Sequence, residues 1–315
     1  MSLDESYEKI RTEIAKVIQG MDEVIEFSLA ALFSCGHVLL EGPPGTAKTL
    51  LVRTLAATLD MDVNRIQMTP DLLPSDISGS SIFRDDTKQF DFIPGPIFTN
   101  FLLADEINRA SARTQSAMLE SMQELSVTYG GTTHRLPQPF LTFATQNPIE
   151  QEGTYPLPLA QLDRFMFKVE VPYPEPKTEE NIYREHHATG ALSNPSDRGV
   201  QPVIGKEDVV AARETIRQTH VRDEVIEYVR RIVTATREDD SLAVGASPRA
   251  GLMLMSGAKS LARFAGRDFV TPDDIKAATI PAFRHRIVLS PNAELDGATT
   301  DDSLAYILDS IEVPR

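Results

Sequence analysis

One segment of the sequence has the residue types and spacing of a phosphate-binding loop. It comprises Gly42, Pro43, Pro44, Gly45, Thr46, Ala47, Lys48 and Thr49. In such a loop, glycines let the backbone wrap closely around phosphate oxygens, and successive N–H groups and the N-terminus of the following helix bind the negative charge. We expect Lys48 to reach the β- and γ-phosphates of a nucleotide and Thr49 to ligate Mg²⁺.

The alternative to this interpretation is a Gly/Pro turn followed by a chance Lys-Thr pair. An apolar run at residues 37–41 precedes the segment and a helical pattern follows it, which is the context that a phosphate loop requires. Ala47 stands where a second glycine is usual. We expect alanine to be tolerated there because this residue would already have helical, unstrained dihedral angles. The sequence therefore predicts nucleotide binding.

Two adjacent acids, Asp105 and Glu106, end a second apolar run. An ATPase with a phosphate loop needs such a pair: Asp105 would hold Mg²⁺ through its coordination shell, and Glu106 would orient or deprotonate the attacking water. Taken alone, the pair would favour the alternative interpretation, a solvated strand-to-helix turn. With the phosphate loop upstream it favours hydrolysis, and because no Asn-Lys-x-Asp base-reading motif is visible, ATP is preferred over GTP.

Composition limits the remaining possibilities. The chain has 315 residues, 31 Lys plus Arg against 46 Asp plus Glu, and a net charge of −15. This length favours two domains, and the acidic balance argues against a protein that coats nucleic acid non-specifically. A single cysteine, Cys35, excludes an internal disulfide and CxxC motifs. The polar N-terminus and the absence of a long apolar run predict no signal peptide and no membrane insertion, and hence a cytoplasmic protein.

The elements that must position these residues alternate along the first half of the chain. Apolar strand candidates lie at residues 37–41, 65–69, 101–104, 140–145 and 166–171, and helical windows at 48–59 and 111–125 separate several of them. This alternation predicts a mainly parallel sheet flanked by helices. Two further stretches, 80–93 with its Asp-Asp-Thr turn and 126–136 with Gly130-Gly131, are predicted to be β-hairpin insertions.

The second half of the chain has a different character. Residues 172–202 are rich in Pro, Ser and Asn, with a polar helix near 177–187, and beyond them the patterns are helical throughout. We expect an α/β core at residues 1–175, a linker at 176–205 and a small all-α domain at 206–315.

Taken together, the motifs resemble those of the AAA+ ATPases, and specifically the MoxR family. The phosphate loop, ADEINRA, RTQSAMLESMQE, FATQNP, QLDRF and SPRA occur in that family's order, and the resemblance covers residues 17–311. It implies a P-loop core with a helical lid, assembled into a ring, usually hexameric, with Mg²⁺ and ATP at the subunit interfaces. It also implies that the two hairpins correspond to insertions shared with magnesium-chelatase ATPase subunits and minichromosome-maintenance helicases.

The resemblance assigns three further catalytic residues. Asn147 matches sensor 1, which contacts the γ-phosphate, although an ordinary polar turn before Pro148 is the alternative. Arg164 matches the arginine finger that is supplied to the neighbouring subunit, the alternative being a surface arginine paired with Asp163. Arg249 matches sensor 2, which reaches from the lid to the nucleotide, and its position near a helix N-terminus would otherwise oppose the helix dipole.

Two weaker assignments concern the nucleotide base and the subunit interface. Ile18 and Gly20 resemble the segment that packs against adenine in this family, and a role in the core is the alternative. Arg109 and Arg113 are candidate contacts to a second subunit, and solvated helix-surface arginines are the alternative.

Two classes of function compete for such a ring. The first is a chaperone-like factor that remodels or assembles a client protein, including metal-centre insertion, alongside a partner with a von Willebrand factor A domain. The second is a nucleic-acid motor that grips DNA with its hairpins, which would need basic tips. The first hairpin has Arg84 and Lys88 among three aspartates, and the second has only Arg135 and His134. Protein remodelling is therefore favoured; a slowly hydrolysing regulatory scaffold is a third possibility.

Overall fold

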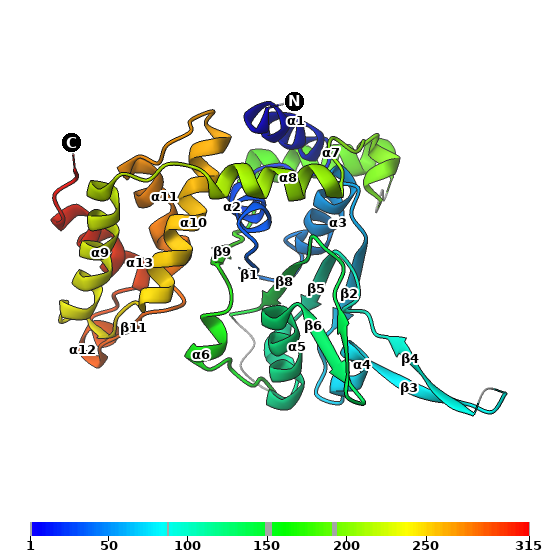
Figure 1. Cartoon of the computed structure of the whole chain (residues 1–315). Coiled ribbons are helices and arrows are strands. Elements are labelled where there is room, and N and C mark those ends of the chain that lie inside the picture. The colour runs from blue at the N-terminus through cyan, green and yellow to red at the C-terminus, as the bar shows by residue number, and fades with distance from the viewer. Residues whose placement is uncertain (1, 87, 149–152, 191–193, 315) are drawn as a thin grey trace.

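The structure, a computed structural model, describes residues 2–86, 88–148, 153–190 and 194–314 (Figure 1). Its centre is a five-stranded sheet of strand order β2-β5-β8-β1-β9 in which every neighbouring pair is parallel. This confirms the predicted parallel sheet. The strands are β1 (Val38–Glu41), β2 (Val63–Gln67), β5 (Phe101–Asp105), β8 (Leu141–Gln146) and β9 (Phe167–Glu170).

Successive side chains of the central strands enter two different hydrophobic clusters. Val38 and Leu40 of β1 belong to a cluster with the helices α1, α2 and α3, whereas Leu39 between them packs with α4 and α5. This is the alternation expected of a strand that is covered on both faces. The covering helices are α1 (Leu3–Ala15), α2 (Asp22–Phe33), α3 (Lys48–Thr58), α4 (Pro74–Ser78) and α5 (Ala112–Glu124).

The parallel register brings the carboxyl ends of three strands to one edge of the sheet. Glu41 is the partner of Gln146, and Ala104 is the partner of Ala144. Asp105, the end of β8 and the start of the phosphate loop are therefore side by side. Ligands bind at this edge in open parallel sheets because the connecting loops and helix N-termini gather there.

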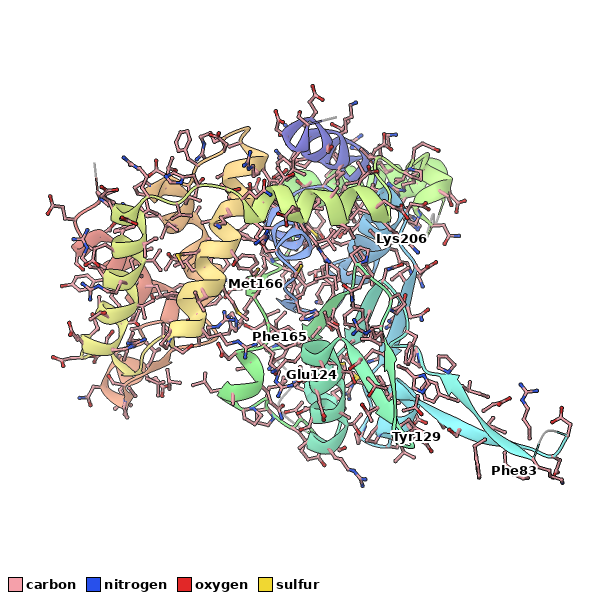
Figure 2. The ribbon with its side chains drawn as sticks, in the orientation of Figure 1. Phe83, Glu124, Tyr129, Phe165, Met166 and Lys206 are labelled. Carbon is pink, nitrogen blue, oxygen red and sulfur yellow. The ribbon has the colours of Figure 1, made fainter. Side chains whose placement is uncertain are left out.

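Both predicted hairpins are present. β3 (Gly79–Arg84) pairs with β4 (Gln89–Pro94), and β6 (Ser126–Tyr129) pairs with β7 (Thr132–Arg135). Near the base of the first hairpin, Phe92 stacks on His134 of the second, with ring centroids 4.1 Å apart. Beyond that contact the first hairpin projects away from the molecule with Phe83 near its tip (Figures 1 and 2). Thr87, in the predicted turn, lies outside the described residues.

Beyond residue 171, the described residues form helices and, as an exception, one small sheet. The longer helices are α7 (Pro176–Thr189), α8 (Lys206–Arg217), α9 (Asp223–Glu238), α10 (Pro248–Phe264), α11 (Pro272–Phe283) and α13 (Thr300–Ser310), and the shorter ones are η2 (Pro195–Arg198) and α12 (Pro291–Leu295). The exception is a two-stranded antiparallel sheet of β10 (Leu242–Val244) and β11 (Val288–Leu289), which the sequence analysis missed because strands this short carry no readable alternation. The predicted domain limits at 175 and 205 stay a prediction.

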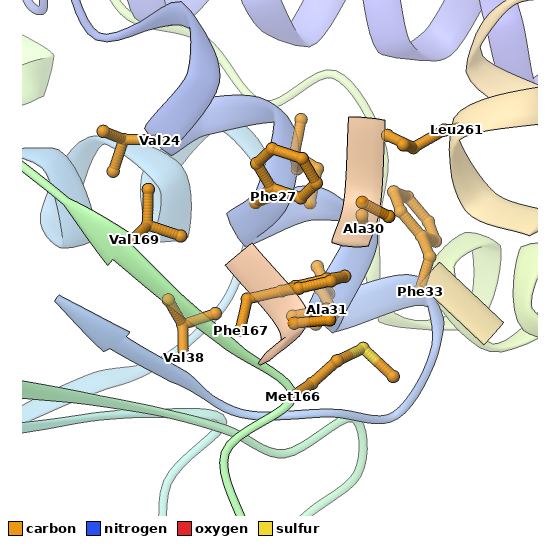
Figure 3. Close-up of a cluster of buried hydrophobic side chains, with 14 of the residues drawn as sticks. Val24, Phe27, Ala30, Ala31, Phe33, Val38, Met166, Phe167, Val169 and Leu261 are labelled. Carbon is orange, nitrogen blue, oxygen red and sulfur yellow. The ribbon is translucent and has the colours of Figure 1, made fainter. Parts of the chain in front are cut away.

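The helical region shares a hydrophobic core with the sheet. Phe27 and Phe33 of α2 lie in one cluster with Phe167 of β9 and Leu261 of α10 (Figure 3). Gly257 of α10 makes the close approach possible, because a Cβ there would lie 2.4 Å from the Phe167 ring. Among the described residues, none of the helices combines the length and apolar character needed to cross a bilayer.

Candidate functional site

The phosphate loop follows β1 and leads into α3, as its motif requires. A side chain at Gly42 would clash with the carbonyl oxygen of Val171, because its Cβ would lie 2.3 Å away. Gly45 has a positive φ of 81°, and its Cα faces open space. The loop is therefore closely backed by β9's C-terminal extension on one side and open on the other, as an enclosing backbone for phosphate oxygens should be.

Ala47 does not have the conformation that we expected. Its φ of 57° and ψ of 21° are left-handed, not the right-handed helical angles that would leave alanine unstrained. This corrects the sequence-based explanation of why alanine replaces the usual glycine. An L-residue in this region carries a strain of about 1–2 kcal/mol. The loop keeps the left-handed turn that its phosphate-binding shape needs and bears that strain at Ala47.

The ammonium group of Lys48 points back into the loop. It donates hydrogen bonds to the carbonyl oxygens of Gly42 at 2.9 Å and Pro43 at 2.7 Å, and to the hydroxyl of Thr46 at 3.1 Å. Burial lowers the pKa of Lys48 from its ordinary value, while the nearby carboxylates of Asp105 and Glu106 act in the opposite direction. The cation is thus held between the loop and the acid pair, the position from which it can bind phosphate oxygens.

The acid pair is organised by Thr145 of β8. Its hydroxyl donates to Asp105 Oδ1 at 2.5 Å and accepts the backbone N–H of Glu106 at 2.8 Å. Arg65 of β2 donates to Asp105 Oδ2 from Nη2 at 2.6 Å and from Nε at 3.0 Å. Strands on both sides of β5 therefore fix the first carboxylate of the pair.

The carboxylate of Glu106 has two partners of its own. Gln67 donates to its Oε2 at 2.6 Å, and Arg109 donates to the same atom at 3.1 Å. The backbone of Glu106 is left-handed, with φ of 57°, so the chain turns sharply directly after Asp105. Arg109 thus contacts the acid pair of its own chain, whereas Arg113 is exposed on α5.

A magnesium nucleotide fits these residues. The open side of the loop offers backbone amides and Lys48 to phosphates, and the hydroxyl of Thr49 and the carboxylate of Asp105 are hard oxygen ligands of the kind that Mg²⁺ takes together with phosphates and water. Among the described residues no group of three or more His, Cys, Asp or Glu side chains could hold a metal ion alone.

Asn147, Ile18 and Gly20 lie in different surroundings. Asn147 directly follows β8, and the amide of Gly42 donates to the carbonyl oxygen of the preceding Gln146 at 3.2 Å, so Asn147 is at the edge of the sheet that carries the phosphate loop. Ile18 is buried in the core cluster between α1 and α2. Gly20 has a positive φ of 73° and lies against Thr178 of α7.

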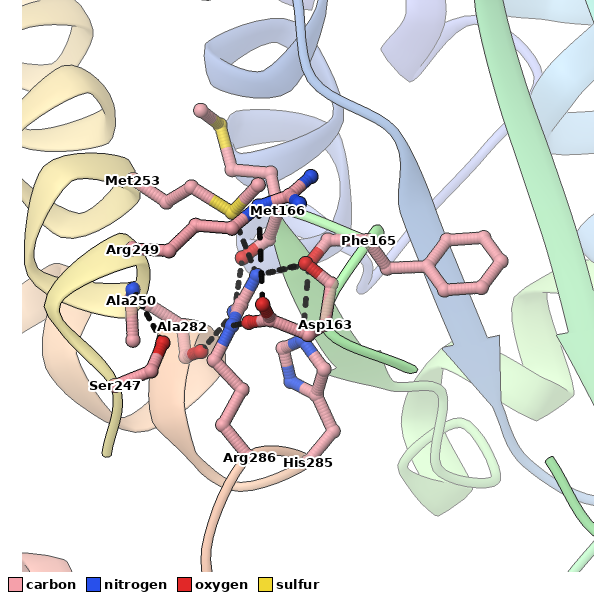
Figure 4. Close-up of polar contacts among 10 residues, drawn as sticks. All are labelled: Asp163, Phe165, Met166, Ser247, Arg249, Ala250, Met253, Ala282, His285 and Arg286. Carbon is pink, nitrogen blue, oxygen red and sulfur yellow. Dashed lines mark hydrogen bonds and ion pairs between the residues drawn. The ribbon is translucent and has the colours of Figure 1, made fainter. Parts of the chain in front are cut away.

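Arg164 and Arg249 lie at the opposite edge of the sheet. Arg164 precedes β9 by three positions, and the neighbouring Met166 N–H donates to the carbonyl oxygen of His37, which precedes β1. Arg249 reaches from the first turn of α10 to Asp163, with 3.7 Å between Arg249 Nε and Asp163 Oδ2 (Figure 4). Both arginines line one cavity of about 270 Å³. This cavity lies at the edge of the sheet where β1 and β9 begin, whereas the phosphate loop lies at the edge where β1 ends.

The sequence analysis missed several residues of these sites. Thr145 lies within the FATQNP motif, whereas Arg65 and Gln67 lie in β2 outside any motif. Only the strand order of the sheet brings these three residues to the acids. Asp163, considered as a partner for Arg164, instead pairs with Arg249 and with a lid residue, Arg286. No sequence signal marked Arg286.

Comparison with known proteins gives consistent results over nearly the whole chain. Residues 37–167 match the family described as "ATPase family associated with various cellular activities (AAA)", and residues 234–307 match the AAA lid domain. The chain is 44% identical to the protein YeaC of Bacillus subtilis over 96% of its own length and 92% of that protein. It is also 44% identical to the chaperone MoxR1 of Mycobacterium tuberculosis, over 96% of its own length and 81% of that protein.

A solved structure shows the same fold. The crystal structure of a suspected ATPase from Cytophaga hutchinsonii superposes with a TM-score of 0.90 at 41% sequence identity, covering 99% of this chain and 96% of that one. Family, lid and neighbouring fold together establish that the chain hydrolyses ATP.

Proposed function

The chain belongs to the MoxR family of AAA+ ATPases, and from this we propose that it works as a hexameric ring that uses Mg²⁺ and ATP to remodel or assemble a client protein. The observation that carries the proposal is the position of Arg164 and Arg249. They lie at the edge of the sheet opposite their own phosphate loop, so a second copy is needed to bring a phosphate to them.

In the proposed reaction, the loop and Lys48 bind the β- and γ-phosphates, and Thr49 and Asp105 hold Mg²⁺, which when bound neutralises developing phosphate charge. Glu106 accepts hydrogen bonds from Gln67 and Arg109 and orients the attacking water, taking up its proton. Asn147, at the same edge of the sheet, contacts the γ-phosphate. Gly20, in the connection between α1 and α2, provides a surface for adenine, and Ile18 in the same connection anchors it to the core.

The two arginines complete the site of the neighbouring copy. A guanidinium supplied to the transferring phosphoryl group stabilises charge in the transition state and couples hydrolysis to assembly. Because Arg249 belongs to the lid and Arg164 to the core, rotation of residues 206–315 relative to residues 1–175, through the linker at 176–205, would change the geometry of both. Arg113, exposed on α5, is available to the same interface.

The hairpins are the proposed contact to the client. The two cations of the first hairpin are already neutralised within it, since Arg84 pairs with Asp91 and Lys88 pairs with Asp85 at 3.1 Å. Phe83 and Phe90 beside them are exposed, Phe90 by 72%. A surface of apolar rings and neutralised cations favours a polypeptide over a phosphate backbone. A protein partner with a von Willebrand factor A domain and a role in metal insertion follow from the family resemblance.

Replacing Glu106 with glutamine tests this function. The variant should bind ATP normally while its hydrolysis rate falls at least about 100-fold, a typical loss for a catalytic base. It should form rings that retain the client, which affinity purification and mass spectrometry would identify. Lys48→Ala is the matched control, which should bind neither ATP nor the client. Tight binding of single-stranded or duplex DNA by the ATP-bound rings, with no retained protein, would refute the proposal in favour of a nucleic-acid motor.

A further inference from the structure

Arg286, which follows α11 in the lid, donates several hydrogen bonds to the segment that precedes β9. Its side chain is only 2% exposed. Nε donates to Asp163 Oδ1 at 2.7 Å, Nη1 to the carbonyl oxygens of Met166 at 3.0 Å and Ala282, and Nη2 to those of Asp163 at 3.2 Å and Phe165 at 2.5 Å. These acceptors use all five N–H donors of a guanidinium. Nη2 also contacts Sδ of Met253 in α10 at 2.6 Å. The acceptors other than Ala282 and Met253 belong to one short segment.

That segment is residues 163–166, between α6 (Leu159–Leu162) and β9. It lies in neither a helix nor a strand. Its backbone N–H groups donate to carbonyl oxygens of α6 and of His37, while lid side chains donate to its carbonyl oxygens. Arg286 binds its backbone on both sides of Arg164, and the neighbouring His285 adds a contact from Nε2 to the carbonyl oxygen of Phe165 at 3.0 Å (Figure 4). Two lid side chains therefore hold carbonyl oxygens on both sides of Arg164.

Arg164 itself is held by its backbone and not by its head group. Its Nη1 is buried and has no hydrogen-bond partner among the described residues. Asp163, the residue before it, is the carboxylate that Arg286 and Arg249 share. The buried guanidinium of Arg286 thus contacts both the segment that contains Arg164 and the carboxylate that pairs with Arg249.

We propose that Arg286 is a positioning residue for Arg164 and Arg249, through which the lid sets the geometry of the arginines supplied to the neighbouring copy. This inference rests on the proposed function. Lysine cannot replace Arg286, because an ammonium has three donors and lacks the planar fork that reaches several carbonyl oxygens at once.

The contacts of Arg286 are not needed merely to hold the lid against the core, because another arginine also joins these regions. Arg284, two positions away and with a side chain 9% exposed, joins the same two regions by ion pairs with Glu170 of β9 at 3.5 Å and Asp301 of α13 at 2.5 Å. Arg284 has no hydrogen bond to residues 163–166 among the described contacts. Arg284→Gln is therefore the matched control: it weakens the same junction but leaves the segment of Arg164 in place.

The test compares Arg286→Lys and Arg286→Gln with Arg284→Gln in steady-state ATPase assays. We expect both Arg286 variants to lose about 10- to 100-fold in kcat with little change in KM, because a misplacement near 1 Å can reduce a rate by that factor. Arg284→Gln should keep kcat within about twofold despite a comparable loss of stability. An Arg286 variant that is folded and retains wild-type kcat would overturn the proposal.

Subunit mixing distinguishes positioning from general damage. Glu106→Gln subunits bind ATP but cannot hydrolyse it, and they carry intact arginines. Mixed equally with an Arg286 variant, they should restore roughly a quarter of wild-type turnover per subunit, because roughly half of the subunits keep an active site and roughly half of those have a competent neighbour. Asp163→Asn, which keeps the side-chain shape but removes the shared charge, gives the same readout if the Arg286 variants do not fold.

Arg164→Ala is the reference in the mixing experiment. If Arg164→Ala is restored by Glu106→Gln subunits but the Arg286 and Asp163 variants are not, the positioning role is wrong while the shared site stands. If Arg164→Ala is not restored either, the proposed sharing of arginines is wrong, and the inference about Arg286 is wrong with it.

Discussion

The hydroxyl of Thr145 offers the sharpest test of how the acid pair is organised. Thr145→Val keeps the shape of this buried side chain and removes only the group that donates to Asp105 and accepts from the Glu106 amide. Loss of a hydrogen bond to a charged group costs about 1.5–3 kcal/mol, and an amide left without an acceptor costs about 1–3 kcal/mol. Because the two effects overlap, we expect the free energy of unfolding to fall by about 2–4 kcal/mol.

The same change should affect catalysis more than nucleotide binding. The phosphate loop makes no hydrogen bond to Thr145, so ATP affinity, measured by calorimetry, should change little. With both acids released from β8, kcat should fall about 10- to 100-fold. Thr145→Ser, which retains the hydroxyl, is the control and should stay within about threefold of wild type. A folded valine variant with wild-type kcat would refute the argument that β8 holds the acids in register.

Three further predictions concern the phosphate loop and the buried His37. Lys48→Ala should abolish ATP binding in calorimetry while Lys206→Ala, at an exposed ion pair, does not; unchanged affinity would remove the loop from the site. Ala47→Gly should raise the free energy of unfolding in urea by about 0.5–1 kcal/mol, because glycine adopts the left-handed conformation without strain; a loss of stability would contradict that reading. Burial lowers the pKa of His37 to about 4, below the ~6.5 of an unfolded chain, so the unfolded state binds more protons and stability falls as pH drops below ~6.5. His37 alone should contribute a loss of about 1.4 kcal/mol at pH 5.5, and His37→Gln should show a correspondingly shallower decline in urea unfolding than the wild-type chain.

Local patterns were sufficient for much of the fold. The strands around Leu39, Leu103 and Phe143 were predictable because a strand that is covered on both faces is a short apolar run, and both hairpins because their turns and alternating side chains are local features. The strained conformation of Ala47 and the short β10–β11 sheet could not be predicted. Neither a single dihedral angle nor a strand of two or three residues leaves a periodic signal in the sequence.

Residues adjacent in the chain were enough to identify the chemistry: a loop for phosphates, two acids at the end of a strand, and a family with those motifs in that order. The residues that serve those groups became apparent from the packing of the strands and the lid. Thr145 meets Asp105 because β8 lies beside β5, and Arg286 meets Asp163, 123 positions earlier in the chain, because the lid packs against the start of β9. Such contacts depend on the packing of whole elements, and no local pattern of residue types encodes which distant side chain will complete a hydrogen bond.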